Sequence, residues 1–198
     1  AGGEKTALPA LFHNCGGSEG EVRYDYMDII TRKYQENFSC QLGDWCTAHG
    51  VEYIGHVLED NGLHSRLGPG TGHYFRAMRG QHMAGIDVVL NQLLPDKDKG
   101  IGAFYHYAIA QLAASAAHQN PWMKGRALCE IFGAFGWSEG LTMMKWMADH
   151  MMVNGINTFT PHAFTEKAFP DPDCPPHFYA HGMNPQYRDM HGLFQYMD

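Results

Sequence analysis

Acidic and histidine side chains follow apolar, strand-like segments at four places in this sequence. In parallel α/β proteins the reacting groups collect at the carboxyl ends of the strands. Two carboxyl groups at such an edge can cleave a glycosidic bond, because one protonates the leaving oxygen and the other activates water or attacks the anomeric carbon. The polar residues delivered in this way are His56, Glu59 and Asp60, then Asp87 and Asn91, then Glu130, and finally His162.

Glu59 and Glu130 are the two candidate catalytic acids. Glu130 stands in the stretch "CEIFGAFGWSEG", residues 129–140, after an apolar approach and before five uncharged residues. A carboxylate inside a buried strand is costly unless it is paired, so Glu130 is either satisfied structurally or faces a cleft. Glu59, in "LED", has the alternative of an exposed turn after a strand.

Four further residues are predicted to bind substrate: His56, Asp60, Trp137 and His162. Each has a structural alternative. The histidines could be satisfied core residues, Asp60 a loop cap, and Trp137 a packing residue at a helix start. Asp87, early in its strand, is interpreted as a structural hydrogen-bond acceptor. The junctions "HGVEYIGH" (49–56) and "NGINTFTPH" (154–162) are alike, which predicts equivalent positions for His56 and His162.

Strands alternate with helices along the chain. A long amphipathic helix is predicted over 21–48, and Gly50 ends it in the left-handed cap position. One face of this helix carries apolar residues at gaps of three and four, namely Met27, Ile30, Tyr34, Phe38, Leu42 and Trp45. Further helices are expected over 102–119, 138–153 and 186–197, and strands over 51–56, 85–90, 126–132 and 156–164.

This alternation predicts an α/β fold with a parallel sheet. The strands begin 35, 41 and 29 residues apart, at Val51, Ile86, Ala127 and Ile156. A (β/α)8 barrel of the TIM type needs roughly 30 residues per unit, given about 250 residues in all. The 198 residues are therefore interpreted as a single domain with about four parallel strands, either part of such a barrel or an open sheet.

Composition narrows the classes of function. The formal net charge of −7 argues against a nucleic-acid or anionic-membrane partner. No apolar run approaches the roughly 20 residues of a membrane span. The five cysteines have no CxxC pair, and neither GxGxxG nor GxxxxGK[ST] is present. The sequence thus favours a globular protein whose partner is not nucleic acid or membrane.

Several blocks together resemble the later part of a catalytic barrel of large glycoside hydrolases, closest to the α-L-rhamnosidase family 106 and its relatives. The most specific block is "EIFGAFGWSEGLTMMKWMADHMMVNGINTFTPHAF", residues 130–164. The others are "LPALF" (8–12), "YDYMDIITRKYQENF" (24–38), "DWCTAHGVEYIGHVLED" (44–60) and "MAGIDVV" (83–89).

The resemblance implies an inverting mechanism on a rhamnoside-like sugar. It implies catalytic roles for Glu59 in "GHVLE" and Glu130 in "EIFGAFGW", without deciding which of them is the acid. It also implies calcium as a possible cofactor, with no ligands assigned, and a periplasmic or extracellular location. The family's barrel has earlier strands and accessory β-domains that this sequence does not include, so a fragment, the C-terminal half of the barrel, is expected.

Two alternatives remain beside the hydrolase. The chain could be a non-catalytic or incomplete barrel fragment that binds carbohydrate or self-associates through open sheet edges, as a homo-oligomer or with the missing barrel half. It could also be a metal-dependent hydrolase using His56 and His162, although HxH and HExxH spacings are lacking.

Overall fold

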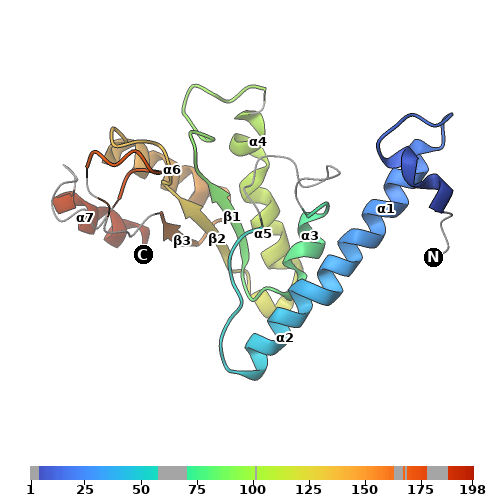
Figure 1. Cartoon of the computed structure of the whole chain (residues 1–198). Helices are drawn as coiled ribbons and strands as arrows, with labels where there is room; N and C mark the ends of the chain where they lie inside the picture. Colours follow the sequence, from blue (N-terminus) through green and yellow to red (C-terminus); the bar gives the residue numbers. More distant parts are fainter. Residues whose placement is uncertain (1–4, 58–70, 101, 163–166, 168, 178–186) are drawn as a thin grey trace.

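The computed structural model describes residues 5–57, 71–100, 102–162, 167, 169–177 and 187–198. Figure 1 shows a small sheet flanked by helices, with α1 extending away from it. The α-helices are α1 (Glu19–Tyr34), α2 (Cys40–Ala48), α3 (Tyr74–Ala77), α4 (Gly102–Tyr107), α5 (Ile109–Gln119), α6 (Leu141–Val153) and α7 (Tyr187–Met197). The strands are β1 (Ala84–Val88), β2 (Ala127–Ile131) and β3 (Thr158–Pro161). A π-helical turn, η2 (Gln35–Ser39), joins α1 to α2, and 3-10 turns occupy η1 (Lys5–Leu11), η3 (Met78–Gly80) and η4 (Pro121–Met123).

The three strands form a parallel sheet in the order β1-β2-β3. Successive side chains of a strand point to opposite faces. One face carries Ile86 and Cys129, which are fully buried in the hydrophobic core with Ile109 and Ala113 of α5 and Met147 of α6. The opposite face carries the polar residues of interest. The predicted α/β class is therefore confirmed for the described residues, which show a three-stranded parallel sheet with flanking helices.

The expected first strand, 51–56, is not a strand. The segment runs beside β1. One backbone hydrogen bond connects it to the residues just before β1: His82 N–H donates to the Tyr53 carbonyl at 2.8 Å. The edge of β1 is already engaged, because the Tyr74 hydroxyl donates to the Gly85 carbonyl at 2.7 Å. The prediction of about four parallel strands is therefore wrong for the described residues.

A close backbone approach holds this segment against the sheet. A Cβ atom built on Gly85 would lie 2.0 Å from the Gly55 carbonyl oxygen and 2.5 Å from its carbon. Because a Cβ projects from the face of a strand, the Gly55 peptide lies over the Gly85 Cα rather than in line with its hydrogen-bonding groups. Glycine at 85 thus lets the chain cross the strand, which places His56 above β1.

The long helix predicted over 21–48 is confirmed, with the π-helical turn η2 inside it. Gly50 ends it with a φ of 69°, as expected. Near η2 the helix crosses η3 at very short range: the Ser39 hydroxyl donates to the Ala77 carbonyl at 2.6 Å and accepts from Gly80 N–H at 3.0 Å. A Cβ on Gly43 would fall 2.0 Å from the Gly80 carbonyl oxygen, so the crossing requires glycine there.

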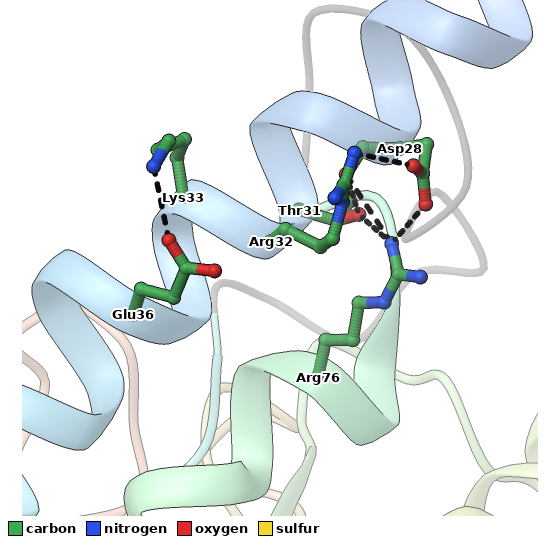
Figure 2. Close-up of polar contacts among 6 residues, drawn as sticks. All are labelled: Asp28, Thr31, Arg32, Lys33, Glu36 and Arg76. Atoms are coloured by element: carbon green, nitrogen blue, oxygen red, sulfur yellow. Dashed lines mark hydrogen bonds and ion pairs between the residues drawn. The ribbon is translucent and has the colours of Figure 1, made fainter.

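Arg76 of α3 fixes the middle of α1 (Figure 2). One guanidinium nitrogen donates to the Asp28 carboxylate at 2.7 Å, to the Thr31 hydroxyl at 2.7 Å and to the Asp28 carbonyl at 3.3 Å. Arg32 holds the other carboxylate oxygen of Asp28 at 2.8 Å. These contacts lower the pKa of Asp28, the hydrogen bond from Arg76 contributing most.

The bounds of the remaining helices differ only slightly from those predicted from the sequence. The predicted helix over 102–119 is divided into α4 and α5, and α6 begins at Leu141 with Gly140 as its N-cap, three residues later than predicted. Gly155 ends α6 with a φ of 98°. The last helix begins at Tyr187, close to prediction. Within the described part of the chain, no helix is long and apolar enough to cross a membrane.

Candidate functional site

A row of three polar residues crosses the sheet near the carboxyl ends of its strands. Asp87 of β1 is the register partner of Glu130 of β2, and Glu130 is the partner of Thr160 of β3. Directly opposed residues on neighbouring strands point to the same face, so their side chains meet. Asp87 is buried, Glu130 is partly buried and Thr160 is exposed. The sheet therefore presents two adjacent carboxyl groups at this edge.

His56 contacts both carboxyl groups. Its Nε2 lies 3.2 Å from Glu130 Oε2 and 3.8 Å from Asp87 Oδ2. Because a carboxylate can only accept, the hydrogen bond to Glu130 requires the proton on Nε2 of the imidazole. The extended segment 51–57 thus delivers the histidine, and adjacent strands deliver the acids.

Glu130 is held in its ionised form. The hydrogen bond from His56 lowers the pKa of the Glu130 carboxyl most, and the positive potential of His56 and His162 lowers it further, whereas burial opposes the shift. A carboxylate that stays ionised suits the role of a general base or a nucleophile rather than that of a proton donor.

His162 lies beside the same carboxylate, two residues beyond Thr160 on β3. Its backbone N–H donates to the Ile131 carbonyl at 2.9 Å, which continues the pairing of β2 with β3. A Cβ on Gly133 would lie 2.8 Å from Cγ of the His162 ring, so the glycine makes room for the imidazole. The two junctions that look alike in the sequence differ in the structure, because His162 directly follows β3 whereas His56 lies in a segment that is not a strand.

The loops that follow β1 and β2 have unusual backbone conformations. Leu90 and Asn91 after β1 have φ values of 55° and 57°, and Phe132 and Ala134 after β2 have values of 78° and 59°. Left-handed conformations of residues other than glycine are uncommon and cluster at functional sites. Leu90 N–H donates to the Gly133 carbonyl at 3.0 Å and ties the two loops together.

A cavity of about 470 Å³ opens beside the first of these loops. Its volume lies in the range of sites for small ligands. Its walls are formed by Leu90, Asn91, Gln92, Asp96, Lys97, Lys99, Gly102 and Tyr105.

Contacts at the other end of β2 hold the segment that carries His56. Arg126 makes a bidentate ion pair with Glu52, at 2.7 and 2.8 Å, and also donates to the His82 carbonyl. The His82 ring accepts from Tyr53 N–H at 2.9 Å through Nδ1, and its Nε2 lies 2.8 Å from the Thr47 hydroxyl. These contacts therefore hold Glu52 and Tyr53 in place, a few residues before His56.

Trp137 makes packing contacts in the loop after β2. Its indole N–H donates to the Asp171 carbonyl at 2.8 Å, and its ring meets those of Phe169 and His177 with centroids 5.6 and 5.5 Å away. These contacts correspond to the structural alternative, and sugar binding by Trp137 stays a prediction. Glu59 and Asp60 lie outside the described residues.

Calcium stays a prediction, because the resemblance assigns no ligands to it. In the described ranges no group of three or more His, Cys, Asp or Glu side chains is arranged to hold a metal ion.

Comparisons with protein-family models, with curated proteins and with solved structures found no match to this chain. The candidate site is therefore supported only by the geometry of the described residues. Sequence reasoning singled out Glu130, His56 and His162, which the structure brings together. It treated Asp87 as structural and did not consider Thr160; the available signal was their common register with Glu130, which becomes visible only when the strands are paired.

Proposed function

We propose that this chain carries part of the active site of a glycoside hydrolase, of the kind that cleaves α-L-rhamnosides. The observation that supports it most is the ionised Glu130 carboxylate at the carboxyl edge of a parallel sheet, hydrogen-bonded to His56 and next to Asp87. Carboxyl groups at this edge suit glycosidic cleavage, because such a reaction needs one proton donor and one ionised partner.

The lowered pKa of the Glu130 carboxyl group supports the basic role for Glu130. In an inverting reaction the Glu130 carboxylate accepts a proton from water while that water attacks the anomeric carbon, and a second carboxyl group gives its proton to the leaving oxygen. Glu59 is the sequence candidate for the acid. His56 orients the Glu130 carboxylate through Nε2 and keeps it ionised. His162 and the polar loop after β1 would contact the sugar.

We propose that the sheet and helices around the site are part of a (β/α)8 barrel. The parallel strands, the helices α5 and α6 against one face and the polar residues at the carboxyl edge support this assignment. Further strands would then supply the rest of the sugar-binding wall. No step of the reaction is assigned to calcium.

Hydrolysis of an aryl α-L-rhamnoside by the chain tests the proposal. We expect release of the aryl alcohol, reduced by about 10²-fold or more in Glu130→Gln and in Glu59→Gln, because each removes one partner of acid–base catalysis. Glu36→Gln, on the exposed surface of η2, is the matched control and should leave the rate unchanged. Equal activity in both site variants and the wild type would reject the assigned acids.

The configuration of the released sugar checks the mechanism separately. An inverting reaction on an α-rhamnoside first gives the β-anomer, which proton NMR distinguishes during early turnover. Release of the α-anomer would instead require a retaining mechanism, with Glu130 as the nucleophile.

A further inference from the structure

The cavity beside the loop after β1 carries more positive than negative charge. Lys97 and Lys99 both line it, and among the described residues of its walls Asp96 is the one acid. Asp98, which lies between the two lysines in the sequence, is turned to α4 instead, where its carboxylate accepts from the Tyr107 hydroxyl at 3.4 Å. Two cationic side chains against one acid make the cavity attractive to an anionic group.

The charges of these two lysines are not engaged in ion pairs within the described part of the chain. The lysines that do form ion pairs there are Lys33, Lys145 and Lys167. Lys97 and Lys99 are exposed, so their ammonium groups can turn toward a ligand in the cavity. Binding an anion at this place therefore breaks no ion pair among the described residues.

Helix α4 holds the backbone of the loop that carries the two lysines. The buried His106 donates from Nε2 to the Leu94 carbonyl at 2.9 Å. A Cβ atom added to Gly102 would clash with the Lys97 carbonyl, so the loop lies directly against the start of α4. Figure 1 shows the loop beyond the end of β1, before the chain turns back into α4. A loop held in this way costs less to order when a ligand binds.

The cavity begins close to the candidate active site. Leu90 lines it and follows Asp87 by three residues, so the Cα atoms of these two residues are at most about 11 Å apart. Leu90 N–H also donates to the carbonyl of Gly133, the residue that makes room for the His162 ring. One oligosaccharide can therefore reach both the Glu130 carboxylate and the cavity.

Other polar groups of the cavity suit the hydroxyl groups of a sugar. The side-chain oxygen of Gln92 accepts from Val89 N–H at 3.0 Å, which sets the orientation of this amide. The Gln92 amide nitrogen, the Asn91 amide and the Asp96 carboxylate offer donors and acceptors to hydroxyl groups. The cavity thus combines groups that bind hydroxyls with two cations that bind an anion.

We propose that this cavity is the subsite for an acidic sugar of the substrate, whose carboxylate or sulfate group is bound by Lys97 and Lys99. The inference rests on the proposed function, because it places the acidic sugar within reach of the bond that is cleaved. Lysine acts as a point charge and so binds either kind of anionic group. A neutral sugar of the same shape lacks this attraction, so the subsite selects acidic glycosides.

Binding of monosaccharides to the full chain tests the subsite without requiring hydrolysis. In an NMR titration at low salt, glucuronate and glucose 6-sulfate should shift the amide signals of Asn91 and Lys99, and glucose should need about tenfold higher concentrations or more. Lys97→Met combined with Lys99→Met should weaken binding of both acidic sugars by about fivefold or more. Asp96→Asn should tighten it by about twofold, because a repelling charge is removed.

Lys124→Met is the matched control. Lys124 is an exposed lysine shortly before β2, at the opposite end of the strands, and its loss changes the net charge by the same amount as the loss of either cavity lysine. Binding should be unchanged in this variant. Glucose binding as tightly as the acidic sugars, or equal losses of binding in Lys124→Met and in the double variant, would overturn the inference.

Two further comparisons separate the possible outcomes. Inorganic sulfate should bind more weakly than glucose 6-sulfate, and equal binding would mean an anion site without a role in sugar recognition. Cleavage of the aryl rhamnoside by a chain that does not bind acidic sugars would reject the subsite alone. Acidic sugars bound through the two lysines of a chain that cleaves no rhamnoside would support the subsite and reject the hydrolase.

Discussion

Asp87 and Glu130 stand directly opposite each other on β1 and β2, and His56 contacts both of their carboxyl groups. Two carboxylates at neighbouring positions on one face repel each other unless a proton donor lies between them. The histidine supplies that donor from a segment that does not belong to the sheet. The electrostatic state of the site therefore depends on how firmly residues 51–57 are held against β1.

Replacing His56 by alanine should raise the pKa of Glu130. The hydrogen bond from His56 is the largest influence that lowers this pKa, and burial, which remains, raises it. Carbon-13 NMR titration of the glutamate carboxyl groups would measure the change. His49→Ala, an exposed histidine on the C-terminal side of α2, is the control. A Glu130 pKa that did not move in His56→Ala would contradict the contact.

The same contact predicts how stability depends on pH at the acid end. The folded pKa of Glu130 lies below its ordinary value of 4.5, so its contribution to stability is fully present above about pH 4.5 and declines as pH falls. Chemical denaturation at pH 6 and pH 3.5 should show a smaller acid-induced loss of stability for Glu130→Gln than for the wild type. An equal loss in both proteins would exclude this contribution.

Gly85→Ala should displace the segment that carries His56. The added Cβ would lie 2.0 Å from the Gly55 carbonyl oxygen, which is backbone and cannot rotate away. We expect a loss of about 1–3 kcal/mol in the free energy of unfolding, typical of overpacking. Any hydrolase activity should fall together with stability.

A helical glycine provides the control for this substitution. Nothing lies within 4 Å of a Cβ built on Gly20 of α1, so Gly20→Ala should be neutral or stabilise by up to about 1 kcal/mol. Urea denaturation compares the two variants. A Gly85→Ala protein as stable as the wild type would show that the backbones are not in contact.

Glu139 gives the opposite pH dependence. It is 5% exposed, and burial raises the pKa of its carboxyl group to about 9. The folded protein therefore binds this proton more tightly than the unfolded chain does. Its contribution is complete below about pH 4.5 and declines as pH rises toward 9.

Glu139→Gln should remove this decline, because glutamine stays neutral. Thermal denaturation between pH 5 and pH 9 should show the wild type losing stability relative to the variant as pH rises. Glu21→Gln, an exposed residue of α1, should behave like the wild type. Parallel curves for Glu139→Gln and the wild type would contradict a neutral buried acid.

Arg76→Met should loosen α1. The substitution keeps an unbranched apolar side chain but removes three hydrogen bonds to Asp28 and Thr31. Amide hydrogen exchange in α1 should accelerate, with little change in β2. Arg32→Met, which loses the more exposed ion pair to Asp28, should change exchange much less. Equal effects of the two substitutions would mean that Arg76 does not anchor the helix.

Local chemistry determined much of this structure. The helix over 21–48 and its glycine end, the strands β1 and β2 and the helices α5 and α6 follow from the spacing of apolar residues and from turn residues, which act over a few positions. The prediction of a polar edge at the carboxyl ends of the strands came from the same pattern. Glu130, His56 and His162 were identified in this way.

Tertiary structure decided what spacing could not. Segment 51–56 has the composition of a strand, but Tyr74 occupies the edge of β1 and Gly85 lets the segment cross over it. Asp87 belongs to the site because the register of β1 and β2 places it opposite Glu130, which lies 43 positions further along the chain. The apolar face of the helix over 21–48 was evident in the sequence, yet only the packed molecule shows which of its residues stay exposed, Tyr24 and Trp45 the most. Patterns along a chain encode which face is apolar, whereas the partner of that face is fixed by long-range packing.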